Sequence, residues 1–116
     1  MSAKDTEQIV LLDKDELILL IIKYLKDNRQ TKFRELLDDL HAYDIADIYK
    51  SMPFKHHHKF ILMSTPEQIA LLIGELDIEY QEEIIQKLGV EKTSKVMDLM
   101  ENDDLADLLN ELSVEK

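Results

Sequence analysis

The chain has no cysteine and no tryptophan, and it has only two glycines and two prolines among its 116 residues. Without cysteine it cannot form disulfides, a thiolate metal site or a cysteine nucleophile, which suits a reducing compartment. So little glycine and proline leaves few turns for a β-sandwich, whereas the abundant leucine, isoleucine, glutamate and lysine favour helices. These absences predict an all-α fold.

Long apolar runs are also missing. The longest, "LILLII" at 17–22, is far shorter than the roughly 20 residues that span a bilayer. The N-terminus does not resemble a signal peptide, because Asp5, Glu7 and Asp13 interrupt it. With 45% hydrophobic and 34% charged residues, residues 1–116 are expected to form one cytosolic globular domain.

Basic residues are scarce in the second half of the chain. Residues 1–64 contain 11 acids and 10 bases, whereas residues 65–116 contain 14 acids and 4 bases. The net charge of −11 argues against nucleic acid as a partner, because phosphates require a basic surface. No Gly-rich elbow, phosphate loop or set of catalytic partners is present, so we do not expect an enzyme.

A twelve-residue repeat runs through residues 41–112. The eighth and ninth places of six successive blocks are apolar at all twelve positions, which are Ile48, Tyr49, Phe60, Ile61, Leu72, Ile73, Ile84, Ile85, Val96, Met97, Leu108 and Leu109. The segment 29–40 fits as a degenerate earlier block, and Asp15 to Lys26 is predicted to be a longer capping helix. Twelve residues suit a two-turn helix followed by a turn.

The first residues of the blocks support this interpretation. Thr65, followed by Pro66 and by Gln68 three residues on, is typical of an N-cap with a capping box. Asp77 takes the same first place one block later, and Gly89 can end one helix and start the next. Within a block the fifth, eighth, ninth and twelfth places share one helix face. Such helices bury their apolar faces by stacking on neighbours, as in a solenoid.

Three segments carry a resemblance to a known family: "LHAYDIADIYKSM" (40–52), "LDIEYQEEIIQKL" (76–88) and "MENDDLADLLNEL" (100–112). They resemble repeating blocks of the cytosolic N-terminal domain of MgtE-type magnesium transporters, and the likeness extends over about residues 17–116. The block "PFKHHHKFILMS" (53–64) departs from the pattern, because lysines and histidines replace its acids.

The resemblance implies a right-handed superhelix of short helices. In the family this module is followed by CBS domains and a homodimeric transmembrane pore, and Mg²⁺ bound between the N-terminal and CBS domains keeps the gate closed. "SVEK" (113–116) restates "GVEK" (89–92), so we expect the chain to stop as a further block begins, before those domains. The membrane would be reached only through the missing transmembrane part.

Acids in the last block are the candidate cation ligands. Asp103, Asp107 and Glu111 fall at i, i+4 and i+8, in one row beside the apolar stripe. Glu79 and Glu83 take the third and seventh places two blocks earlier, where Asp103 and Asp107 stand in theirs. The resemblance implies that these four acids, Glu79, Glu83, Asp103 and Asp107, face Mg²⁺, weakly in the isolated domain.

Acids of the last block allow another interpretation, in which they interact with the helix macrodipole and keep the surface soluble. This alternative stays open for Asp103 and Asp107, and it is the better explanation for Asp104 and Glu101. The triplet His56 to His58 cannot form a metal site alone, because consecutive helical residues point about 100° apart, so a solvated or packing role is expected. An alternative function is an armadillo-like or FliG-like adaptor whose acidic face holds a basic protein.

Overall fold

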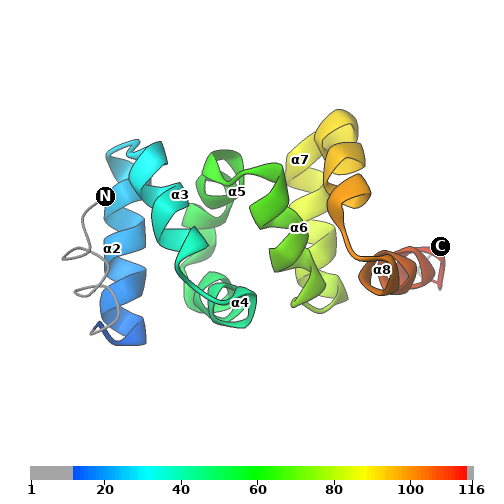
Figure 1. Cartoon of the computed structure of the whole chain (residues 1–116), viewed down its shortest axis with the longest axis horizontal. Coiled ribbons are helices and arrows are strands. Elements are labelled where there is room, and N and C mark those ends of the chain that lie inside the picture. The colour runs from blue at the N-terminus through cyan, green and yellow to red at the C-terminus, as the bar shows by residue number, and fades with distance from the viewer. Residues whose placement is uncertain (1–11, 115–116) are drawn as a thin grey trace.

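The computed structural model describes residues 12–114, and all regular secondary structure within that range is helical. The elements are α2 (Lys14–Lys26), α3 (Gln30–Asp38), α4 (Ala42–Ser51), the 3₁₀ turn η1 (Phe54–His56), α5 (His57–Met63), α6 (Pro66–Gly74), α7 (Ile78–Leu99) and α8 (Asn102–Val114). They follow one another from α2 at one end to α8 at the other (Figure 1). The all-α prediction is confirmed, and the handedness of a superhelix stays a prediction.

The twelve-residue register sets where most helices begin. His41, Thr65 and Asp77 are N-caps, each at the first place of its block. Thr65 also forms the expected capping box: its Oγ1 accepts from the Gln68 amide at 3.1 Å, and the Gln68 Oε1 accepts from the Thr65 amide at 3.0 Å. Asp77 holds its N-cap position without a side-chain hydrogen bond to the helix.

Gly89 divides α7 into two helical segments, as predicted. Its φ of 79° and ψ of 172° are not helical, and this positive φ is a conformation that glycine adopts without steric penalty. The block that starts at Pro53 differs from the repeat, because the short turn η1 comes first and α5 begins only at His57.

Burial follows the repeat closely at the eighth place. Every eighth-place side chain, from Ile48 to Leu108, is at most 2% exposed. The ninth place is buried in the first three blocks, half-buried at Ile85 and Met97, and 47% exposed at Leu109. The core therefore thins toward α8, which is the last helix described and packs mainly on α7.

The ends of the described range agree with the predicted capping helix. Asp13 caps α2 and forms a capping box with Glu16. At the other end α8 continues through Ser113 to Val114 without a new start. Glu115, Lys116 and residues 1–11 lie outside the described range. No helix between residues 12 and 114 is long and apolar enough to cross a membrane.

Candidate functional site

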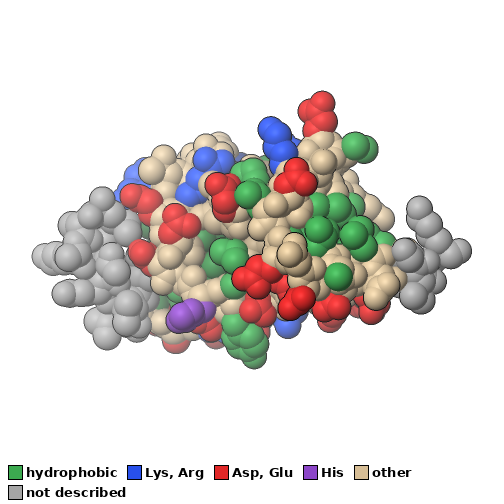
Figure 2. Space-filling model, turned by 45° about the vertical axis from the view of Figure 1, so that its right-hand side comes forward, with side chains coloured by type: hydrophobic (Ala, Val, Ile, Leu, Met, Phe, Trp, Pro, Cys, Tyr) green, Lys and Arg blue, Asp and Glu red, His purple; other side chains and the backbone are tan. Residues whose placement is uncertain are grey.

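A pocket of about 300 Å³ lies where α6, α7 and α8 meet. Its lining residues are Gly74, Leu76, Asp77, Ile78, Gln81, Asp104, Asp107 and Glu111. Four of the eight carry a carboxylate, and we call this the acidic pocket. Figure 2 shows acidic side chains gathered along the lower edge of the C-terminal half of the molecule.

The helices bring these acids together for simple geometric reasons. Asp104, Asp107 and Glu111 fall at i, i+3 and i+7 of α8, and therefore lie on one helix face. Asp77 is the N-cap of α7 and lies three residues after α6 ends at Gly74. Gln81 joins these two helices, because its Nε2 donates to the carbonyl oxygen of Ile73 at 2.9 Å.

Gly74 allows α8 to come close to the end of α6. A Cβ at this position would lie 2.6 Å from Oδ2 of Asp104, a distance at which the side chain would have to move. Asp104 is thus held against the C-terminal end of α6, where the helix dipole is negative. This arrangement concentrates negative charge, and its oxygen donors are those that hard cations such as Mg²⁺ prefer.

The acidic pocket does not supply a complete set of protein ligands for a metal ion. Within residues 12–114, no group of three or more acids and histidines is arranged to hold one metal ion. Mg²⁺ commonly keeps several waters and takes only one or two carboxylates. The acidic pocket therefore suits a hydrated ion, with room for ligands from another surface.

The structure separates the four predicted ligands. Asp107 lines the acidic pocket, whereas Asp103 and Glu79 are exposed and are not among its lining residues. Asp104, attributed from the sequence to the macrodipole and solubility, lines the pocket instead, together with Asp77. Nothing in the sequence indicated this, because the approach of Asp104 to α6 depends on how α8 packs.

Glu83 has partners of its own. Its Oε2 accepts a hydrogen bond from the hydroxyl of Tyr49 and lies 2.9 Å from Nδ1 of His57. The other ring nitrogen of His57, Nε2, donates to the carbonyl oxygen of Tyr49 at 2.8 Å. We call Tyr49, His57 and Glu83 the polar junction, since they join α4, α5 and α7.

The polar junction is inside the molecule. Tyr49 and His57 are 0% and 3% exposed, and their rings stack with centroids 4.0 Å apart. Burial, followed by the hydrogen bond to Glu83, raises the pKa of Tyr49, so its hydroxyl remains a donor. The packing role expected for the histidines holds for His57, and His58 is exposed.

Comparisons with known proteins agree with one another. Residues 40–116 match the model of the family described as the MgtE intracellular N domain. The chain is also similar to the magnesium transporter MgtE of Bacillus subtilis strain 168, with 44% identity over 95 residues. That match covers 82% of this chain and 21% of the relative, so the chain spans about a fifth of the transporter's length.

A solved structure shares the fold. It is the crystal structure of the soluble part of a magnesium transporter, and it matches with a TM-score of 0.74 at 22% identity. The match covers 84% of this chain and 39% of the other. The helical stack described above is therefore a fold already seen in such a protein.

Proposed function

The chain belongs to the family of MgtE intracellular N domains, and we propose that it is the cytoplasmic regulatory domain of a magnesium transporter. In this proposal it senses intracellular Mg²⁺ through its acidic face, which meets CBS domains of the same, longer and homodimeric protein. Binding of the ion there controls the gate. The matches favour this function over the adaptor.

The acidic pocket is the observation that carries the proposal. Asp104 and Asp107 lie with Asp77 and Glu111 around a cavity of about 300 Å³, next to the C-terminal end of α6. Carboxylates that face one another repel unless a cation lies between them. A pocket of this kind responds to the concentration of a divalent ion, because the ion offsets that repulsion.

The four ligands predicted from the sequence have different roles in this proposal. Asp107 lines the pocket, and Asp103 and Glu79 are exposed carboxylates that an opposing domain can reach. Glu83 already holds Tyr49 and His57 through Oε2 and does not line the pocket, so we assign its predicted place to Asp104. The ion would keep several waters, with one or two of these carboxylates in contact.

In this proposal, charge alone determines whether the domain and its facing domain come together. At low Mg²⁺ the acidic face and acids on the facing domain repel, and the domains separate. At high Mg²⁺ hydrated ions bridge the two surfaces, which stabilises the closed arrangement. The isolated domain supplies only half of such a site and should bind the ion weakly, because screened attraction offsets little of the cost of removing water.

The test compares the complete cytosolic region of the transporter with a variant carrying Asp104→Asn and Asp107→Asn. Both changes remove charge at nearly constant shape. Protection from a protease, measured against Mg²⁺ concentration, should need at least about tenfold more Mg²⁺ in the variant, as expected when ligands near a metal are lost.

The matched control is Glu67→Gln with Glu91→Gln. These two exposed acids on α6 and α7 are not lining residues of the acidic pocket, and the control removes the same charge. Its protection curve should coincide with that of the wild type. Superimposable curves for all three proteins would contradict the proposal.

A further inference from the structure

The acid-free segment from Ile48 to Pro66 has no part in the acidic pocket. No aspartate or glutamate occurs in it, although the whole chain has a net charge of −11. Its middle is the turn η1, where Phe54 is 66% exposed and Lys55 is exposed as well. An exposed aromatic ring beside lysines is a surface feature that the proposed sensing function does not explain.

Residues from three elements meet at this turn. Nζ of Lys87, from α7, lies 4.7 Å from the centre of the Phe54 ring. Burial lowers the pKa of His56, and the positive charges of Lys55 and of Lys26, in the last turn of α2, lower it further. We call Lys26, Phe54, Lys55, His56 and Lys87 the basic surface.

The Phe54 ring is exposed, but two neighbouring side chains fix its position. Its ring packs on buried His57 in an edge-to-face pair with centroids 5.5 Å apart, and Nζ of Lys87 lies over one face of the ring. A ring held in this way loses little conformational entropy when it enters an apolar environment. The basic surface therefore combines a positioned apolar group with cations around it, which fits a partner that is anionic outside and apolar beneath.

We propose that the basic surface binds anionic lipid headgroups, with the Phe54 ring entering the boundary between headgroups and acyl chains. Aromatic and aliphatic residues flanked by lysine are typical of such interfacial contacts. All three fixed charges are lysines, which are depleted at protein–protein interfaces, whereas arginine is enriched there and recognises carboxylates bidentately. This composition favours a lipid surface over an acidic protein.

The acids of the acidic pocket do not prevent this contact. Lys87 lies ten residues from Asp77 along α7, about 15 Å at 1.5 Å per residue, and the Debye length is about 8 Å at physiological ionic strength. The acidic pocket is thus largely screened from a membrane at the basic surface.

The expected affinity is low. Each lysine near an anionic membrane strengthens binding by about fivefold, so three of them give only weak attachment. Weak binding is sufficient for a domain already tethered to a membrane protein, and this step alone rests on the proposed function. The sequence predicted membrane contact only through a missing transmembrane part, and the basic surface would add a second contact.

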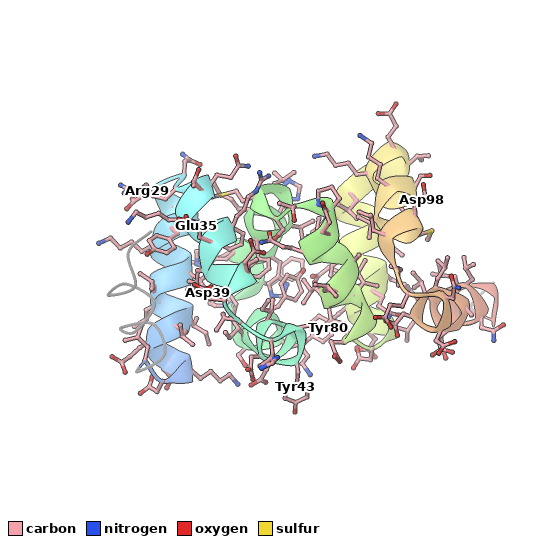
Figure 3. The ribbon with its side chains drawn as sticks, viewed as in Figure 1. Arg29, Glu35, Asp39, Tyr43, Tyr80 and Asp98 are labelled. Carbon is pink, nitrogen blue, oxygen red and sulfur yellow. The ribbon has the colours of Figure 1, made fainter. Side chains whose placement is uncertain are left out.

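The first test uses the absence of tryptophan in the chain. Phe54→Trp places a single fluorescent reporter on the basic surface, and Tyr43→Trp places one on an exposed side chain in the first turn of α4, which points away from the helices (Figure 3). Each protein is mixed with phosphatidylglycerol vesicles or with phosphatidylcholine vesicles. EDTA is present, so that no divalent ion can bridge acids to lipid phosphates.

The expected result is a blue shift for the Phe54→Trp protein with phosphatidylglycerol only, and none for the Tyr43→Trp protein. Lys26→Gln with Lys55→Gln, added to Phe54→Trp, should weaken binding by about 25-fold. The matched control, Lys92→Gln with Lys95→Gln on the second segment of α7, removes two exposed lysines and should leave binding unchanged.

Three outcomes would overturn the proposal: no shift with either lipid, equal shifts for both reporters, or equal weakening by both lysine pairs. A shift caused by a poly-glutamate peptide but not by phosphatidylglycerol would also overturn it and would point to an acidic protein. Because Mg²⁺ is absent throughout, none of these results bears on the sensing function of the acidic pocket.

Discussion

At the scale of single residues, the polar junction shows that one place of the repeat can hold either an apolar core residue or a buried hydrogen-bonding residue. The fifth place of a block faces the core and holds Ile45 and Ile69 in two of them, but His57 in another. The sequence indicated that His57 faces partly inward. It could not indicate Tyr49 and Glu83 as partners, because these contacts depend on how α4, α5 and α7 pack.

We predict that His57→Ala destabilises the domain by about 2–4 kcal/mol. The change removes the ring that links the Tyr49 carbonyl to the Glu83 carboxylate, and it leaves a cavity in the core where that ring stacks on Tyr49. The matched control is His58→Ala, an exposed neighbour, which should change stability by less than about 0.5 kcal/mol. Urea unfolding measures both, and equal effects would contradict the role assigned to His57.

The raised pKa of Tyr49 gives a prediction about alkaline pH. The unfolded chain releases the Tyr49 proton near pH 10, whereas the folded domain retains it because of burial and the nearby Glu83. The contribution to stability is therefore full below pH 10 and falls above it, by about 1.4 kcal/mol per pH unit.

Tyr49→Phe should be less stable at neutral pH but should lose less stability between pH 10 and pH 11 than the wild type. Tyr43→Phe, at a side chain that is 71% exposed, should follow the wild-type pH profile. Parallel profiles for all three proteins in urea unfolding would show that Tyr49 ionises as freely in the folded domain as in the unfolded chain.

At the scale of helices, the repeat allowed most boundaries to be predicted. Each block needs an N-cap and an apolar face, and both are local properties of the sequence. The late start of α5 after η1 was not predicted, since the twelve-residue spacing alone does not distinguish a 3₁₀ turn from the first turn of an α-helix. The exposure of Leu109 was also missed, because the repeat does not specify which helix covers it.

Gly89 and Gly74 give a paired prediction at this scale. Gly89→Ala should destabilise the domain by about 1–2 kcal/mol, because the positive φ is unfavourable for a residue with a Cβ. Gly74→Ala should be nearly neutral in stability. The gain in helix propensity of about 1 kcal/mol offsets the displacement of the Asp104 side chain. Thermal unfolding checks both, and equal effects would contradict the break at Gly89.

At the scale of the whole molecule, the net negative charge is concentrated in the C-terminal half. The hydrophobic core, in contrast, extends through both halves. The buried hydrophobic side chains form one continuous cluster from Ile21 to Leu108, and apolar burial of this kind stabilises a fold without a bound ion. We predict that the domain is helical and unfolds cooperatively in EDTA, as stacked repeats should. Loss of helical circular dichroism on adding the chelator would contradict this.

The placement of the candidate ligands could be predicted only in part. The sequence identified an acidic last block and the row containing Asp107, because helix periodicity determines which residues share a face. It did not identify Asp77 or Asp104, since the acidic pocket is formed by α6, α7 and α8 together. The distance between Gly74 and Asp104 is a property of the packed helices.

The most direct test of the account is a titration of the ¹⁵N-labelled domain with Mg²⁺, followed by amide chemical shifts. If the acidic pocket holds a hydrated ion, the largest changes should occur at Gly74, Asp77, Asp104 and Asp107. They should saturate only at millimolar concentrations, and Asp104→Asn with Asp107→Asn should abolish them. Changes spread evenly over all exposed acids, or unaltered in the variant, would contradict a specific role for the pocket in sensing magnesium.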